Sequence, residues 1–263
     1  MEIMQRLNFW VPIVIFTIVL IPILVYTVMT LTGKRKKYDR VEQDGGTRIL
    51  GKFLMEVSHF MMTPVGNFFA AAKITPNVIT SFSVLLAALA AVFIASGYTG
   101  LGGGIASTAS ILDLVDGMVA RKKNLISLFG KLFDSFCDRV SELFILAGLV
   151  ILFRENLLML GFTLALLAGS FLGSYLSALE REQKIESGRG FMRRPERVAY
   201  LLVSILVTQY FTSANFPEIS RRPDTLVLAV MIILLGFATN ISVFMRLRRI
   251  YLLLYSSKNI FPK

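Results

Sequence analysis

Four aspartates are the residues of this chain best suited to chemistry. Asp113 and Asp116 are three positions apart, and Asp134 and Asp138 are four apart, so each pair lies on one face of a helix. Both pairs border strongly apolar stretches. A carboxylate at the centre of a bilayer costs about 2.5–3.5 kcal/mol on insertion scales, and four carboxylates that converge repel one another. A divalent cation between them offsets both effects, so the pattern predicts a metal site.

The aspartates belong to a longer pattern with fixed spacing. From Asp113 it reads Asp-x-x-Asp-Gly-x-x-Ala-Arg, then eight residues, then Gly-x-x-x-Asp-x-x-x-Asp, which ends at Asp138. Its glycines, Gly117 and Gly130, need a physical reason, because glycine inside a helix costs roughly 0.5–1 kcal/mol relative to alanine. One reason is close packing between membrane helices. The other is a flat ligand that approaches the backbone, with Ala120 keeping the same surface shallow.

The composition is typical of a basic, polytopic membrane protein. The chain has 263 residues, 55% of them hydrophobic and 17% charged, with a mean hydropathy of +0.66 and a formal net charge of +11. The single cysteine, Cys137, excludes an intramolecular disulfide. The lone His59 excludes a histidine-rich metal site and a Ser-His-Asp triad. The expected surroundings are a lipid bilayer, with no nucleic-acid partner.

Apolar segments of transmembrane length recur along the chain. Each is close to the ~20 residues that cross a hydrocarbon core of ~30 Å. The first ends in a basic run and is followed by no small-residue cleavage site, so we expect a retained anchor. The segments run approximately over residues 9–32, 78–97, 101–120, 126–152, 157–179, 198–216 and 225–245.

Lysine and arginine are concentrated in one set of connections. These are residues 34–73, 121–123, 181–197 and the stretch from Arg246 to the C-terminus. The positive-inside rule puts this set in the cytoplasm and the amino terminus outside. Both aspartate pairs then lie at the cytoplasmic mouth. We therefore predict a multi-pass protein of the cell inner (cytoplasmic) membrane whose active site faces the cytoplasm.

Residues 47–72 predict an amphipathic helix in the cytoplasmic interface. Thr75-Pro76-Asn77 then predicts a helix start, with Thr75 as N-cap and Pro76 at the first helical position. Asn77 and Thr80 fall in that first turn, where a capping role and a ligand-binding role are both open. The helical spacing sets apolar residues against polar ones: Leu50, Phe53, Leu54, Val57, Phe60 and Met61 on one side, and Lys52, Glu56 and His59 on the other.

The predicted fold class is an all-α integral membrane protein. It has a six-transmembrane-helix core, an N-terminal transmembrane helix and an interfacial amphipathic helix. The expected divisions are an N-terminal anchor, a basic linker with the interfacial helix, the six-helix domain and a cytoplasmic tail, over residues 1–33, 34–74, 75–250 and 251–263.

The pattern from Asp113 to Asp138 resembles, at all eight fixed positions, the signature of the CDP-alcohol phosphotransferases (CDP-alcohol phosphatidyltransferases). These integral membrane enzymes make phospholipids by displacing CMP from a CDP-linked alcohol. Thr75-Pro76-Asn77-x-x-Thr80 is similar to the start of the first core helix in that family, and the resemblance covers roughly residues 47–250.

The resemblance implies a metal-dependent transferase that works as a homodimer. Two divalent ions, magnesium or alternatively manganese, would be held by Asp113, Asp116, Asp134 and Asp138, and Asp138 would also be the general base. Arg121, with Lys122 or Lys123, would offset the charge of a bound pyrophosphate. The site for the cytidine nucleotide would comprise Asn77, Thr80, Asp116, Gly117, Ala120, Arg121 and Gly130.

The implied donor is CDP-diacylglycerol, and the acceptor is a small polar alcohol. Asp134-Ser135-x-x-Asp138-Arg139 is more similar to prokaryotic phosphatidylinositol phosphate synthases than to phosphatidylglycerophosphate synthases. The expected acceptor is therefore a phosphorylated polyol such as inositol phosphate, with phosphatidylglycerophosphate or phosphatidylserine synthesis as alternatives. The implied acceptor-binding residues, each equally interpretable as a solvated loop residue under an anionic leaflet, are Arg181, Arg193, Arg194 and Arg197.

The chain departs from those inositol-phosphate enzymes after Ser174-Tyr175. Their pattern continues x-Lys-Ala-Arg-Ala-Glu, whereas this chain has Ser177 for the Lys, Leu179 for the Arg and Arg181 for the Glu. Two anticipated phosphate-binding cations are therefore missing or displaced.

Two other classes of function are consistent with intramembrane aspartates. A cation transporter or channel would have polar residues that continue toward the far side, whereas these spans become uniformly apolar. A non-catalytic membrane scaffold descended from an enzyme would have lost a metal ligand or the base, and every one of them is retained.

Overall fold

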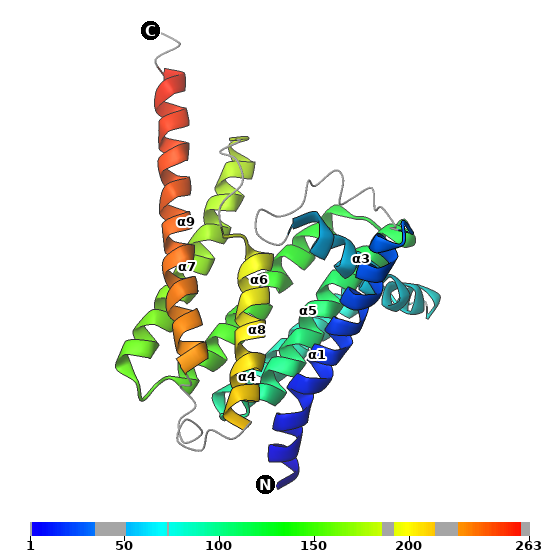
Figure 1. Cartoon of the computed structure of the whole chain (residues 1–263). Coiled ribbons are helices and arrows are strands. Elements are labelled where there is room, and N and C mark those ends of the chain that lie inside the picture. The colour runs from blue at the N-terminus through cyan, green and yellow to red at the C-terminus, as the bar shows by residue number, and fades with distance from the viewer. Residues whose placement is uncertain (1, 35–50, 73, 186–191, 214–225, 259–263) are drawn as a thin grey trace. The chain divides into compact units, whose positions relative to one another are not determined.

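The computed structural model describes residues 2–34, 51–72, 74–185, 192–213 and 226–258, and in that part of the chain every regular element is a helix (Figure 1). The all-α prediction is confirmed. The helices are α1 (Glu2–Leu31), α3 (Gly51–Ala71), α4 (Pro76–Ala95), α5 (Thr99–Lys122), α6 (Leu128–Leu152), α7 (Leu157–Glu182), α8 (Arg194–Ser213) and α9 (Leu226–Lys258).

Five of the described helices are long and apolar enough to cross a membrane: α1, α4, α5, α7 and α9. The chain is thus a multi-pass membrane protein. The remaining two predicted spans form the helices α6 and α8. Neither is among the described helices that are long and apolar enough to cross a membrane. Charged residues interrupt α6 from Lys131 to Glu142, and the end of the span predicted over 198–216 lies outside the described residues. α9 continues past its predicted end at 245, since neither proline nor glycine follows before Lys258.

The helices form two compact units. The first comprises Met1–Leu152 and Ile205–Pro223, and the second comprises Phe153–Ser204 and Asp224–Lys263. All four predicted aspartates and the helices from α1 to α6 belong to the first unit, whereas α7 and α9 belong to the second.

In the first unit, α1 docks closely on the N-terminal end of α5. A Cβ on Gly100 would overlap the carbonyl oxygen of Asn8, and a Cβ on Gly104 would overlap Cγ1 of Val11. The side chain of Asn8 also accepts a hydrogen bond from the backbone N–H of Leu101 at 2.9 Å. That N–H is one of the first-turn donors that a helix cannot satisfy itself. α1 therefore caps α5 as well as packing against it.

α4 packs against both aspartate-bearing helices. A Cβ on Gly102 of α5 would lie 2.6 Å from Cγ1 of Ile94, and a Cβ on Gly148 of α6 would lie 2.8 Å from the carbonyl oxygen of Ala91. Only glycine permits these approaches. A buried apolar cluster then joins α3, α4 and α5 near the other end of α5, made of Met62, Ile79, Leu112, Val115 and Val119.

α3 is joined to α1 by a buried polar contact that corrects the predicted amphipathic pattern. The O–H of Tyr26 donates to the carboxylate of Glu56 at 3.0 Å, and the two residues are 0% and 2% exposed. The rings of Phe53 and Phe60 lie 5.7 and 5.6 Å from that of Tyr26. Placing Glu56 on the polar, outward side was therefore wrong, because its partner comes from a helix far away in the sequence. Leu50 lies outside the described residues.

In the second unit, α7 packs against α9 through small residues. A Cβ on Gly169 would lie 2.8 Å from Nδ2 of Asn240, and a Cβ on Gly173 would lie 3.4 Å from Cγ2 of Val243. Asn240 also donates to the carbonyl oxygen of Ala165 at 2.9 Å. Gly169 and Gly173 thus serve packing within this one chain.

Tyr26→Phe should lower the stability of the folded protein, because Glu56 stays buried but loses a hydrogen-bond donor. Leaving a buried polar group short of a partner costs about 1–3 kcal/mol. We expect a lower thermal midpoint in detergent. Tyr175→Phe is the control, since Tyr175 is 61% exposed. Equal midpoints for Tyr26→Phe and the wild type would contradict a stabilising role for the contact.

Candidate active site

Three of the four predicted metal ligands come together between α5 and α6. Asp113, Asp116 and Asp134 each offer a carboxylate oxygen, and these three oxygens all lie within 4.8 Å of one another. Oxygen ligands lie about 2.0–2.6 Å from Mg²⁺ or Ca²⁺, so ligands on opposite sides of one ion are about 4–5 Å apart. The arrangement fits a divalent cation. Asp138 follows one turn after Asp134 on α6 and is not among these three.

The local electrostatics favour a cation at this site. Asp116 is buried, at 3% exposure, and the carboxylates of Asp134 and Asp138 both repel it. The hydroxyl of Thr80, itself 2% exposed, donates to Oδ2 of Asp116 at 2.5 Å. Thr80 therefore fixes the orientation of one carboxylate, and a cation bound at the cluster would offset the repulsion among the acids.

A cavity of about 340 Å³ opens beside the carboxylates, with walls from α4, α5, α6 and the α5–α6 connection. Asp134 lines it too. Every residue that the sequence predicted to bind the nucleotide lines this one cavity: Asn77, Thr80, Asp116, Gly117, Ala120, Arg121 and Gly130.

The start of α4 brings Asn77 and Thr80 to the cavity. Thr75 occupies the N-cap position, as predicted, with an extended backbone and Pro76 directly after it. Its side chain makes no capping hydrogen bond; its carbonyl oxygen instead accepts from the N–H of Val78 at 3.1 Å. Thr80 lies one turn into the helix, where its hydroxyl reaches the aspartate on α5 rather than a capping position.

The structure favours ligand approach over helix packing for Gly117 and Gly130. A Cβ on Gly117 would meet only the side chain of Arg121, with Nη1 at 3.4 Å. A Cβ on Gly130 would meet the side chains of Ser127 at 3.0 Å and Asn77 at 3.8 Å, which also line the cavity. Among the described residues, no backbone atom of another helix comes close to a Cβ placed at either position, in contrast to Gly100. The two glycines keep the cavity surface open.

The three basic residues at the end of α5 have different surroundings. Arg121 lines the cavity. Lys122 donates to the side chain of Asn67 in α3, and Lys123 donates to the carbonyl oxygen of Ile74 at 3.0 Å. Both lysines therefore fasten neighbouring segments, and neither lines the cavity beside Arg121 as a further charge for a pyrophosphate.

Sequence reasoning missed Ser127 and Lys131, which also line the cavity. The hydroxyl of Ser127 accepts from the backbone N–H of Gly130 at 2.9 Å, and its carbonyl oxygen accepts from the N–H of Lys131. A serine directly before a helix is a recognised N-cap signal. The signal for Lys131 is its place three residues before Asp134, on the same helix face.

In the second unit, two arginines bind serines on one face of α7. Arg197 of α8 is 4% exposed and donates to Oγ of Ser170 at 2.7 Å. Arg246 of α9 donates to Oγ of Ser177 at 2.6 Å. The serines are two helical turns apart. Arg197 is thus a buried residue rather than a solvated loop residue, whereas Arg181 is exposed and Arg193 and Arg194 are partly buried.

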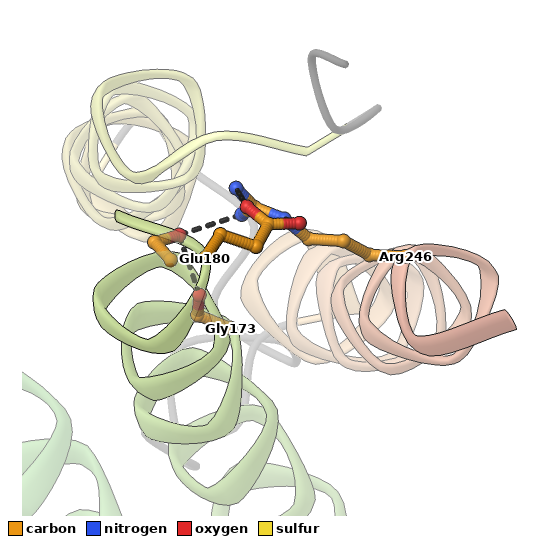
Figure 2. A network of polar contacts seen from close by, with 4 residues as sticks. Gly173, Glu180 and Arg246 are labelled. Atoms are coloured by element: carbon orange, nitrogen blue, oxygen red, sulfur yellow. Dashed lines mark hydrogen bonds and ion pairs between the residues drawn. The ribbon is translucent and has the colours of Figure 1, made fainter. Parts of the chain in front are cut away.

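Arg246 was not predicted as a site residue, and it supplies a positive charge at the position where the related pattern has a lysine. Ser177 replaces the lysine of the related pattern, and the Arg246 guanidinium reaches this serine from another helix. Arg246 also forms an ion pair with Glu180, as Figure 2 shows. Ser177 in turn donates to the carbonyl oxygen of Gly173 at 2.8 Å. The guanidinium is therefore held from two sides.

The fold and the site define a multi-pass, all-α membrane protein with an acidic cluster over an open cavity. A sequence model of the CDP-alcohol phosphatidyltransferase family matches residues 73–254, and this chain belongs to that family. The resemblance is confirmed, and so is the prediction of an enzyme rather than a transporter or scaffold.

Relatives of known name include two kinds of inositol-lipid enzyme. The phosphatidylinositol phosphate synthase of Mycobacterium tuberculosis is 27% identical over 194 residues, which are 72% of this chain and 85% of that protein. The archaetidylinositol phosphate synthase of Pyrococcus horikoshii is 31% identical over 145 residues, which are 54% of this chain and 74% of that protein.

Solved structures of the Mycobacterium tuberculosis synthase have the same fold. The crystal structure with CDP-DAG bound gives a TM-score of 0.63 at 25% identity, over 72% of this chain and 93% of that chain. The crystal structure in complex with manganese and citrate also gives a TM-score of 0.63, at 24% identity, over 72% of this chain and 88% of that chain.

Gly117→Leu should weaken nucleotide binding without unfolding the protein, because the new side chain would project into the cavity. We expect at least a tenfold weaker affinity for CMP in a direct titration, equivalent to about 1.4 kcal/mol. Gly161→Leu is the matched control, since a Cβ on Gly161 meets nothing within 4 Å. Equal affinities in the two variants would remove Gly117 from the ligand surface.

Proposed function

We propose that this enzyme transfers the phosphatidyl group of CDP-diacylglycerol to a hydroxyl of a phosphorylated polyol such as inositol phosphate, releasing CMP. One observation carries the proposal: two members of the acidic cluster, Asp116 and Asp134, line the same cavity as all of the residues predicted to bind the nucleotide. The bilayer supplies the donor lipid, and the basic connections favour a site that faces the cytoplasm of the cell inner membrane. The proposal includes a homodimer, as the family resemblance implies.

The donor site is assigned to the cavity in the first unit. Gly117, Ala120 and Gly130 would form the surface on which the cytidine nucleotide lies, and Arg121 would contact the pyrophosphate. Asn77 would contact the nucleotide from α4. Thr80 would act by positioning Asp116. The relative crystallised with CDP-DAG supports this choice of donor.

Two divalent ions, Mg²⁺ in the first place and Mn²⁺ as an alternative, would be held by Asp113, Asp116, Asp134 and Asp138. When bound, such ions polarise phosphoryl oxygens and stabilise the negative charge that develops during displacement. A related synthase has been crystallised with manganese and citrate, which supports a divalent metal.

Asp138 is assigned as the general base. The acceptor oxygen attacks the phosphorus that carries diacylglycerol, a new P–O bond forms, and the P–O bond to CMP breaks. The hydroxyl proton passes to the Asp138 carboxylate. This carboxylate is one helical turn from Asp134, so it lies on the same face of α6 as the metal site, and it is not one of the three acids whose oxygens cluster within 4.8 Å.

The acceptor phosphate is assigned to basic residues of the second unit: Arg181, Arg193, Arg194 and Arg197. Guanidinium groups suit phosphate because they donate two parallel hydrogen bonds. Arg246 joins this set, because it provides a cation at Ser177. Two related enzymes that act in inositol-lipid synthesis support an inositol phosphate.

The test is CMP release by purified protein given CDP-diacylglycerol, Mg²⁺ and one acceptor at a time. The acceptors are inositol 1-phosphate, glycerol 3-phosphate, serine and free inositol. We expect release only with inositol 1-phosphate, and none after chelation of the metal with EDTA. Release with glycerol 3-phosphate alone would contradict the proposed acceptor and indicate phosphatidylglycerophosphate synthesis. Release with serine alone would likewise indicate phosphatidylserine synthesis.

Asp138→Asn should abolish turnover while leaving the donor able to bind, because the amide cannot take the acceptor proton. A loss of at least a hundredfold in kcat is expected, since general-base catalysis contributes about 10²–10⁴-fold. Donor affinity is measured separately by titration with CDP-diacylglycerol in Mg²⁺. Substantial remaining turnover in a variant that no longer binds donor would contradict the role of base.

A further inference from the structure

We propose that Lys131 is a further catalytic residue, whose ammonium group binds the phosphate of CMP as CMP leaves. This inference rests on the proposed transfer reaction and extends it, because it assigns stabilisation of the leaving group to a side chain outside the aspartate pattern. The evidence comes from the position of Lys131, from its surroundings and from the charge of the departing group.

Lys131 lines the same cavity as Arg121 and Asp134. It precedes Asp134 by three residues on α6, so the two side chains leave the helix on the same face. Arg121 reaches the cavity from the end of α5. The cavity is therefore bordered by one cation from each of the two helices that carry the acidic cluster.

The surroundings of Lys131 distinguish it from its neighbours. Lys122 and Lys123 each bind a protein oxygen, at Asn67 and Ile74. Within the described part of the chain, the Lys131 side chain has neither a hydrogen bond nor an ion pair. Its ammonium group therefore remains available to a ligand in the cavity.

A lysine at this point of α6 has no evident structural benefit. Lys131 is the fourth residue of the helix, and the first turn contains no acidic residue. Cations are disfavoured near a helix N-terminus, where the macrodipole presents partial positive charge. The same partial charge is favourable for a phosphate. An anionic ligand would therefore gain from both the lysine and the helix end that Ser127 caps.

The leaving group is the part of the donor that gains negative charge. As the acceptor oxygen bonds to phosphorus, the P–O bond to CMP breaks and its electron pair goes to the CMP phosphate. The acceptor proton goes to Asp138, and Lys131 stays protonated throughout. A cation at this phosphate binds more strongly as its charge rises, so it stabilises the transition state more than the bound donor.

The experiment uses the purified full-length protein in Mg²⁺ and compares Lys131→Met, Lys131→Arg and Lys52→Met. Lys52→Met removes the same charge from an exposed position of α3 that is not part of the cavity wall. Affinities for CMP and for cytidine are measured by titration, and kcat is measured by CMP release from CDP-diacylglycerol. Cytidine carries the base and sugar but lacks the phosphate.

Lys131→Met should weaken CMP binding by about tenfold or more, because it removes a charge-assisted hydrogen bond. Cytidine affinity should be unchanged. The variant should also lose about 10- to 100-fold in kcat, and Lys131→Arg should recover part of both effects. Lys52→Met should match the wild type in every measurement.

CMP affinity and kcat in Lys131→Met equal to those of Lys52→Met would overturn the inference and leave the proposed transfer standing. An equal weakening of CMP and cytidine would also overturn it, because the effect would then be a general distortion of the cavity. A third outcome is that wild-type protein binds CMP through Lys131 but releases no CMP from CDP-diacylglycerol. This result would refute the proposed reaction, and with it the catalytic role of Lys131.

Discussion

Mutual repulsion among carboxylates is the constraint around which the first unit is arranged. Three aspartate oxygens lie within 4.8 Å of one another, next to helices apolar enough to span a membrane. α5 and α6 must hold them together against that repulsion, because a metal can bind tightly only to ligands that are already close. α4 contributes by packing against both helices and by placing the Thr80 hydroxyl on Asp116.

α5 is fixed at both ends, and its aspartates lie in its C-terminal half. At the N-terminal end, glycines let α1 and α4 approach its backbone. At the C-terminal end, Lys122 binds Asn67 of α3, and α3 is joined to α1 through Tyr26 and Glu56. The side chains that bear charge are thus positioned by contacts that are mostly apolar or neutral. The same helices leave Gly117 and Gly130 uncovered, which gives a ligand access to the acids.

Much of the candidate site could be predicted because most of its residues lie close together in the sequence. Spacing along a helix places Asp113 with Asp116, and the short connection after α5 makes α6 its neighbour, so one sequence window contains most of the cavity wall. What could not be predicted depends on partners distant in sequence. Glu56 looked solvent-facing until Tyr26 of α1 supplied a buried donor. The cation missing at Ser177 is delivered by Arg246, 69 residues later. A residue-by-residue comparison of α7 alone would count that position as a loss.

The docking of α1 on α5 shows that the family match and the packed structure of this chain begin at different residues. The family match begins at residue 73, whereas the residues that cap and cover the start of α5, Asn8 and Val11, lie far before it. The glycines of α5 have no side chains of their own with which to fill the space that α1 occupies. A protein trimmed to the homologous region would expose that seam to lipid and leave the Leu101 N–H without its acceptor. The region that this chain shares with its family is therefore shorter than the region that packs around the start of α5.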